Sequence, residues 1–275
     1  MAEINAALVR QLREETSLPM MDCKQALTEA MGDKEKAKDI LRKKGLKIQE
    51  GRGGRETSFG RFGIYAGVDK KTGGIVELKC ESAPVAGSAD FIQLANDLAK
   101  QLATGPGAKT ADELLDQPSP SQPGKTLRQV KDDLFNRIRE VFNVGRMARL
   151  EGATGGYSHN SGTVSGVLVS VEGGTDEAAK DVSMHVAAMR PLATTKEEID
   201  PAVVAKEREI LREAALAEGK PANIVDKMVE GRLKNFYAEK VLLEQPFVKE
   251  NSLSVGKYAE SKGMQVKKFV HWELG

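Results

Sequence analysis

The sequence predicts an α+β protein with an N-terminal three-helix domain, a duplicated α+β core with antiparallel sheets, and an inserted antiparallel coiled-coil hairpin. Three observations predict this organisation. Apolar residues recur every three or four positions up to residue 46, as in amphipathic helices. From residue 63, β-branched runs alternate with helical segments in two similar blocks. Residues at about 200–238 form two helical runs with heptad-like apolar spacing, separated by a turn.

Residues 1–46 predict three short helices around a small core. Ser17 is a suitable N-cap for the second helix, and Pro19 fits its first turn, where a missing N–H loses no hydrogen bond. Asp33 is expected to cap the third helix and Gly45 to end it. The residues expected to face inward are Ile4, Leu8, Leu12, Cys23, Ala26, Leu27, Ala30, Ala37, Ile40 and Leu41.

The loop between the first two helices ends in Met20 and Met21. On a helical turn the two side chains are about 100° apart, so one can turn inward while the other meets solvent or a partner. The unbranched, polarizable methionine side chain suits an irregular docking surface. On spacing alone, filling a small core is an equally good interpretation.

Residues 47–62 are expected to form a flexible linker, because the glycines of Gly51–Gly63 lose much conformational entropy on ordering. The alternative is weak RNA contact through Arg52, Arg55 and Arg61.

The core is expected to divide into residues 63–143 and 144–275. A β-hairpin, a helix, a loop with a short helical piece and a second helix make up the first block. A strand and a helix recur in the second block, which ends with a helix and a strand. The expected ranges are strands 64–68 and 75–80, helices through Phe91–Leu102, Ala111–Leu115 and Val130–Val141, strand 163–171, helix Asp176–Met189, helix 254–261 and strand 266–274.

The hairpin begins with the capping pair Asp200-Pro201 and turns at Gly219-Lys220-Pro221. Its expected contact positions are Val203, Ile210, Ala214 and Ala217 on the first helix, and Ile224, Met228, Arg232 and Phe236 on the second.

The composition excludes several classes of function. The 41 basic and 40 acidic side chains give no long-range field, and aromatic residues are only 5%, so direct nucleic-acid binding is not expected. Cys23 and Cys80 predict reduced core thiols in a cytoplasmic protein. No apolar run is long enough to span a membrane, and no signal or transit peptide is expected.

No catalytic or metal-binding constellation is predicted. His159, His185 and His271 lack metal-ligand spacing. His185 is expected to be a satisfied core or interface histidine, whereas His159 lies in an expected exposed turn where a contact role and a plain loop role are equally open. Gly124-Lys125 imitates a phosphate-binding loop but lacks the required glycine five positions earlier. We therefore expect no cofactor and no enzyme activity.

Several segments together resemble the bacterial elongation factor Ts family, over nearly the whole chain. The run Leu12-Arg13, Thr16 and Met20–Leu27 is similar to the family's first signature, from which Pro19 departs. Further local matches are Tyr157-Ser158-His159, Met184–Ala188, Lys227–Arg232 and Gln245–Val248.

The resemblance implies a ubiquitin-associated-like N-terminal domain and a guanine-nucleotide exchange factor for elongation factor Tu, acting in the cytoplasm. It implies that Arg13, Met20 and Met21 contact the partner's nucleotide-binding domain, and that His159 faces another domain of the partner. It also leaves room for homodimerisation within a 2:2 complex.

The second family signature is altered. The family carries Thr-Asp-Phe-Val where this chain has Ser82, Ala83, Pro84 and Val85. The family's Asp and Phe disturb the partner's magnesium site and insert between its helices, and neither role carries over to Ala83 and Pro84. Phe91 is expected to pack in the core rather than to replace the lost phenylalanine. From the resemblance we also expect the family's short C-terminal helical module to be missing, because the sequence stops soon after Trp272.

Two hypotheses follow from the resemblance. In the first, the chain is a working exchange factor that displaces nucleotide mainly through the loop that ends in Met20 and Met21 (the methionine loop) and through the core contacts, with a weakened Ser82–Val85 segment. In the second, it is an elongation factor Ts-like binding protein or chaperone of elongation factor Tu with weakened exchange.

Overall fold

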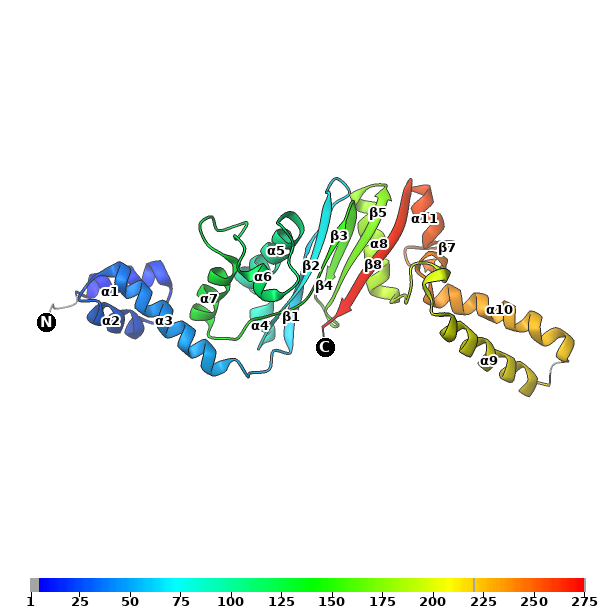
Figure 1. Cartoon of the computed structure of the whole chain (residues 1–275), viewed down its shortest axis with the longest axis horizontal. Coiled ribbons are helices and arrows are strands. Elements are labelled where there is room, and N and C mark those ends of the chain that lie inside the picture. The colour runs from blue at the N-terminus through cyan, green and yellow to red at the C-terminus, as the bar shows by residue number, and fades with distance from the viewer. Residues whose placement is uncertain (1–4, 220, 275) are drawn as a thin grey trace. The chain divides into compact units, whose positions relative to one another are not determined.

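The computed structural model describes residues 5–219 and 221–274. Ile4 and Lys220, which the sequence predicts in the first helix and in the hairpin turn, lie outside these residues. The chain divides into two compact units, which are described separately. The first contains the chain up to Gly63 and Val76–Met147, and the second contains Ile64–Ile75 and Ala148–Glu273. Figure 1 labels the elements along the chain.

Three helices form the N-terminal domain, as predicted: α1 (Ala6–Thr16), α2 (Met20–Glu29) and α3 (Lys34–Arg52). The Asp33 side chain caps α3 by accepting the Lys36 N–H. The buried apolar cluster consists of Val9, Leu12, Leu18, Cys23, Ala26, Leu27, Ala30, Ala37 and Leu41.

Ser17 does not cap α2, so that prediction is wrong. It instead ends α1 in the left-handed conformation (φ 55°) and donates its N–H to the Arg13 carbonyl. The reversal between α1 and α2 is completed within Ser17, Leu18 and Pro19, and α2 starts only at Met20. A left-handed residue at the end of α1 makes this short reversal feasible.

Helix α3 runs through Gly45, so the expected helix end there is wrong. Gly45 is a position of close packing, because a Cβ on it would lie 1.6 Å from Asn136 Oδ1. Strand β1 (Phe59–Tyr65) also starts inside the range expected to be linker. Only residues 53–58 connect helix and strand, a shorter connection than the expected 47–62.

The three arginines of the expected linker are engaged within the fold. Arg52 donates to the Arg139 carbonyl, Arg55 pairs with Glu81 at 3.0 Å, and Arg61 donates to the Ala86 carbonyl at 3.3 Å. These contacts disfavour an interpretation of this segment as a free RNA-binding arm.

Strands β1, β2 (Thr72–Cys80) and β3 (Asn143–Glu151) form a sheet in the order β1-β2-β3. The helices between β2 and β3 are α4 (Ala83–Ala86), α5 (Ala89–Thr104), α6 (Ala111–Leu115) and α7 (Leu127–Ile138). The predicted helices at α5 and α6 are confirmed. Helix α7 ends earlier than expected and excludes Val141, because Arg139 is left-handed (φ 66°).

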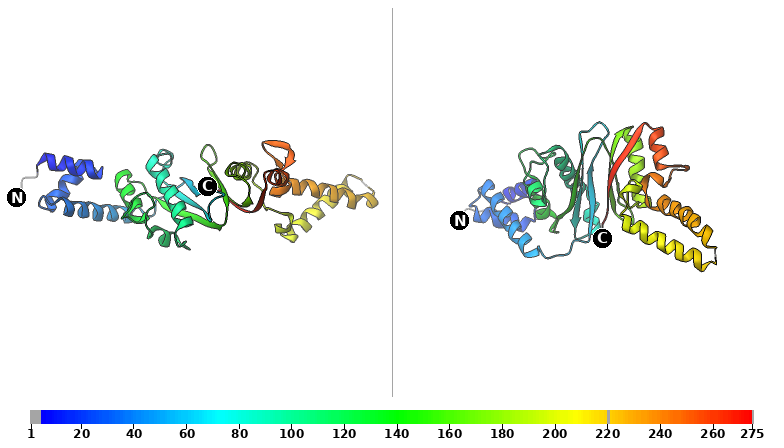
Figure 2. Two further views of the ribbon diagram at one scale, coloured as in Figure 1. Left: turned by 90° about the horizontal axis from the view of Figure 1, so that it is seen from above. Right: turned by 45° about the vertical axis from the view of Figure 1, so that its right-hand side comes forward.

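The second core block contains an antiparallel sheet in the order β4-β5-β8, covered by α8 (Figures 1 and 2). Its strands are β4 (Thr154–His159), β5 (Ser165–Gly173) and β8 (Met264–Glu273). The remaining elements are α8 (Asp176–Met189), η1 (Lys196–Glu198), α9 (Pro201–Ala217), α10 (Ala222–Lys240), η2 (Leu242–Glu244), β6 (Pro246–Phe247), β7 (Glu250–Ser254) and α11 (Val255–Ser261).

The segment before His159 is strand β4 rather than the expected exposed turn. Its glycines serve close packing, because a Cβ on Gly155 would lie 2.5 Å from the Ala179 carbonyl oxygen of α8. Glycine is common in turns, but here Gly155 lacks a side chain so that α8 can lie directly on β4.

The two core blocks repeat one topology. In each, the second strand lies between the first and the third, and a helix follows the second strand. The longest connection in each block joins the second strand to the third. This repetition confirms the α+β class and agrees with the predicted duplication.

The tip of the first hairpin, Ile64–Ile75, groups with the second unit, which differs from the expected boundary at residue 143. The Thr154 N–H donates to the Gly67 carbonyl at 3.1 Å, and the Gly152 N–H donates to the Lys71 carbonyl at 2.8 Å. Asp176 accepts the Val68 N–H at 2.8 Å. These hydrogen bonds tie the tip to the second block.

Helices α9 and α10 pack as an antiparallel pair (Figure 2). The contact face is shifted by one position from the predicted one. The buried or partly buried residues between the helices are Val204, Leu211, Ala215, Val225, Val229, Leu233 and Tyr237. Of the predicted positions, Val203, Ile210 and Ile224 remain 45%, 49% and 38% exposed. On α9 the predicted positions Val203, Ile210 and Ala214 and the positions one residue later are all apolar, so their spacing does not show which set faces α10.

Candidate partner-docking site

The loop between α1 and α2 is held in place by its own buried residues. Leu18 and Cys23 are 6% and 0% exposed. The Cys23 thiol donates to the Leu18 carbonyl at 3.8 Å, and the Thr16 hydroxyl accepts the Leu18 N–H at 3.4 Å. The Pro19 carbonyl accepts the Cys23 N–H, which closes the first turn of α2. The loop therefore has a preformed shape.

Met20 and Met21 project from the first turn of α2, directly after this loop, with 48% and 72% of their surface exposed. Helix α2 buries Cys23, Ala26 and Leu27. At about 100° per residue, Met20 lies at the edge of that buried stripe and Met21 lies nearly opposite it. Neither side chain turns inward, so the interpretation that both fill a core is wrong.

The other predicted contact residues occupy different positions. Arg13 is exposed in the last turn of α1, in the same small domain as the two methionines. His159 ends β4 in the second unit, where it is half-buried. The His159 Nδ1 lies 3.0 Å from the Tyr157 hydroxyl, a hydrogen bond that fixes the ring.

The Ser82–Val85 segment forms the start of α4, directly after β2. Its base is anchored: the Ser82 hydroxyl donates to Glu140 at 2.6 Å, and the Cys80 thiol donates to the Ser82 carbonyl at 3.2 Å. Ala83 and Pro84 are exposed at the start of the helix. At these two positions the segment presents neither a carboxylate nor an aromatic ring.

Phe91 and His185 have the structural roles expected for them. Phe91 is fully buried and its ring meets Phe142 edge-on, with centroids 5.5 Å apart. His185 is also fully buried, and both of its ring nitrogens have hydrogen-bond partners. Burial lowers the pKa of His185.

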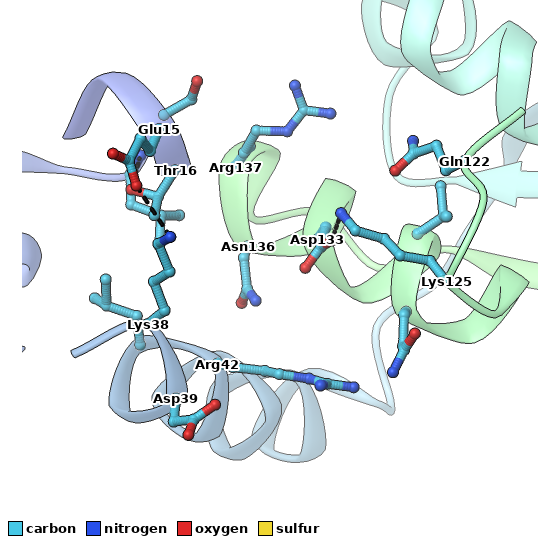
Figure 3. A pocket seen from close by; sticks show the side chains of 15 residues that line it. Glu15, Thr16, Lys38, Asp39, Arg42, Gln122, Lys125, Asp133, Asn136 and Arg137 are labelled. Atoms are coloured by element: carbon cyan, nitrogen blue, oxygen red, sulfur yellow. Dashed lines mark hydrogen bonds and ion pairs between the residues drawn. The ribbon is translucent and has the colours of Figure 1, made fainter. Parts of the chain in front are cut away.

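A polar pocket of about 670 Å³ lies in the first unit (Figure 3). It is lined by residues of α1, α3, α7 and the loop before α7. Two of the lysines that line it are paired with carboxylates of the same pocket: Lys38 binds Glu15 at 3.0 Å and Lys125 binds Asp133 at 2.8 Å. These pairs, drawn in Figure 3, compensate charge that a ligand would otherwise contact.

Sequence reasoning missed Met31, which is 85% exposed and left-handed (φ 51°) in the turn after α2. A methionine beside Gly32 and Asp33 at a helix end was the available signal, because that position favours glycine or asparagine.

Two further findings bear on the kind of site. Within residues 5–219 and 221–274, the His, Cys, Asp and Glu side chains form no group of three or more that could hold a metal ion. Over the same ranges, no helix is long and apolar enough to cross a membrane.

The fold and the loop define a modular α+β protein that displays accessible apolar side chains on a small helical domain. A family model described as elongation factor TS matches residues 81–275. The chain belongs to the elongation factor Ts family, a family of translation elongation factors.

Curated relatives support this membership along nearly the whole chain. The elongation factor Ts of Methylococcus capsulatus is 43% identical over 275 aligned residues, covering 99% of this chain and 92% of the relative. Those of Clostridium botulinum and Aquifex aeolicus are each 41% identical, covering 99% and 97% of this chain and 93% and 96% of the relatives.

Proposed function

We propose that this protein is a guanine-nucleotide exchange factor that binds elongation factor Tu in the cytoplasm and promotes GDP release. Such a factor makes no covalent bond. It binds the nucleotide-free partner more tightly than the GDP-bound partner, and by linkage it weakens GDP binding by the same factor.

The observation that carries the proposal is the pair Met20 and Met21, exposed at the start of α2, directly after a loop that is held by buried residues. A preformed apolar surface loses little conformational entropy on binding, so its contacts contribute more fully to affinity. Arg13 of the same domain adds a charged group for the partner's nucleotide-binding domain, and His159 would contact a second partner domain.

The alternative is an elongation factor Ts-like binding protein or chaperone with weakened exchange. The Ser82–Val85 segment supports this alternative, because its exposed Ala83 and Pro84 have neither the charge to disturb a magnesium site nor the ring to separate two helices.

Stopped-flow release of fluorescent GDP from cognate elongation factor Tu distinguishes the two. The proposal expects release to accelerate with the concentration of this protein. Measurable binding without acceleration would support the chaperone alternative, and absence of binding would refute both. Analytical ultracentrifugation of the nucleotide-free complex tests whether it is 1:1 or the 2:2 assembly that we also propose.

A further inference from the structure

The accessible sulfur atoms of this protein belong to thioethers rather than thiols. Cys23 and Cys80 are both 0% exposed. Burial raises the pKa of the Cys80 thiol to about 11, which keeps it in the unreactive protonated form. By contrast, Met20 and Met21 are about half and nearly three-quarters exposed, at 48% and 72%. A peroxide that meets this surface therefore meets methionine sulfur first.

We propose that Met20 and Met21 are an oxidation site at which peroxides reversibly weaken binding to elongation factor Tu. The inference rests on the proposed function, in which these two side chains contact that partner. It adds a modification site and a class of reagent, hydroperoxides, to the docking loop.

The reaction is a two-electron oxygen transfer. The methionine sulfur attacks one oxygen of the peroxide, the O–O bond breaks and an S–O bond forms. The sulfur is oxidised to the sulfoxide, and hydrogen peroxide is reduced to water. Methionine sulfoxide is returned to methionine by thiol-dependent reductases, so the modification is reversible.

The structure indicates that oxidation acts on docking rather than on folding. The core beneath the loop consists of Leu12, Leu18, Cys23 and Leu27, and neither exposed methionine belongs to it. A sulfoxide on Met20 or Met21 replaces an apolar contact surface by a polar group while the buried cluster stays intact. The expected consequence is a fall in the exchange rate of about tenfold, equivalent to losing one good apolar contact.

The same chain supplies internal controls for accessibility. Met31 is 85% exposed and lies beyond the opposite end of α2, and Met189 is 44% exposed in the second unit. Met264 is 1% exposed. Peptide mass spectrometry after limited hydrogen peroxide treatment should find Met20, Met21 and Met31 oxidised well before Met264.

A footprint tests the docking role separately. Excess nucleotide-free elongation factor Tu should protect Met20 and Met21 from peroxide and leave Met31 reactive. If Met20 and Met21 react equally fast with and without the partner, the docking role itself fails, and the inference fails with it.

The activity test uses protein that is oxidised first and then freed of peroxide with catalase, so that elongation factor Tu is never exposed. Wild-type protein and the Met20→Leu/Met21→Leu variant are each compared with their own untreated samples. The inference expects a roughly tenfold loss for wild type, little loss for the leucine variant, and recovery of wild type after sulfoxide reductase treatment.

Two results would overturn the oxidation site while leaving the docking role standing. One is a normal exchange rate for protein in which Met20 and Met21 are fully oxidised to sulfoxides. The other is an equal loss in the leucine variant, which would place the sensitive group elsewhere in the chain.

Discussion

His185 of α8 and Gln245, which follows η2, are joined by a buried hydrogen bond of 2.9 Å between His185 Nε2 and Gln245 Oε1. The opposite ring nitrogen, Nδ1, accepts the Val248 N–H at 3.1 Å. Nδ1 is therefore unprotonated, and Nε2 carries the proton that it donates to Gln245. The Gln245 amide in turn donates to the Glu239 carbonyl at 2.7 Å, so the histidine links α8 to the end of the coiled-coil hairpin.

This arrangement predicts that acid destabilises the second unit through His185. Its pKa is lowered in the folded state by desolvation, whereas the unfolded side chain titrates near its ordinary value of about 6.5. Below that pH the unfolded state binds a proton that the folded state does not. The free energy of unfolding should therefore be independent of the His185 protonation state above about pH 6.5. It should decrease as the pH falls from there toward the lowered pKa of folded His185.

Urea unfolding at about pH 7.5 and about pH 5.5 measures the effect. His185→Gln should lose about 1–3 kcal/mol at the higher pH but show a smaller decrease between the two. His159→Gln, at the half-buried end of β4, is the matched control. An unchanged pH dependence in His185→Gln would show that another group is responsible.

Helices α3 and α7 approach each other closely where Gly45 faces Asn136. Asn136 is 6% exposed, so its amide has little room to withdraw from a Cβ placed 1.6 Å from Oδ1. Gly45→Ala should therefore destabilise the protein by about 1–3 kcal/mol in urea unfolding.

Gly51 of the same helix provides the matched control, because nothing lies within 4 Å of a Cβ built on it. Gly51→Ala should stabilise α3 by about 0.5–1 kcal/mol. Adding Asn136→Ala to Gly45→Ala should recover part of the loss in a double-mutant cycle. Equal effects of the two glycine substitutions would contradict the proposed contact.

These contacts explain which elements could be predicted from the sequence. Helices α5, α6 and α8 have apolar periodicity and caps encoded within their own segments, so local reasoning finds them. Gly45 and Gly155 look like a helix end and a turn, but each accommodates a residue distant in sequence. Local patterns do not contain that information.

The candidate docking site likewise contains features that the sequence shows and features that only the structure shows. The exposure of Met20 and Met21 follows from their angular position relative to the buried stripe of α2, which puts Met20 at its edge and Met21 nearly opposite it. The start of α2 was not predicted, because Ser17 ends α1 instead of capping α2. The departure at Ala83 and Pro84 was visible directly, because it is a matter of residue identity.

The register of the coiled-coil hairpin predicts unequal effects on stability for one apolar residue of each helix. Leu233 is 1% exposed between the helices, whereas Ile210 is 49% exposed. Leu233→Ala should cost about 2–5 kcal/mol, and Ile210→Ala should change stability by no more than about 0.5 kcal/mol. Hydrogen exchange of the α9 and α10 backbone amides measures the loss of stability in each of the two variants. Comparable losses of protection would favour the other register.

The methionine loop predicts a separation of activity from stability. Met20→Ala with Met21→Ala should slow GDP release from elongation factor Tu by at least about tenfold, since central interface side chains contribute most of the binding energy. Because both are exposed, the free energy of unfolding should change by less than about 0.5 kcal/mol. Met31→Ala, also exposed, should leave exchange unchanged. Normal exchange by the double variant would remove the loop from the mechanism.

The Ser82–Val85 segment predicts a gain of function. Ala83 and Pro84 are exposed at the start of α4, and Ser82 and Cys80 anchor the base of that helix, so new side chains there should not disturb the fold. Ala83→Asp with Pro84→Phe restores the charge and the ring of the family pattern. If this segment reaches the partner's magnesium site, GDP release should accelerate by about tenfold, the equivalent of 1.4 kcal/mol of added stabilisation of the nucleotide-free complex.

The matched control is Ala83→Asn with Pro84→Leu, which adds similar volume without the charge or the ring. Stopped-flow GDP release and urea unfolding should be measured on both variants. Acceleration by the Asp/Phe pair alone would show that exchange here is limited by the altered segment. Equal rates in both variants and the unsubstituted protein would instead show that the methionine loop and core contacts set the rate, because restoring the family pair then adds nothing to nucleotide displacement.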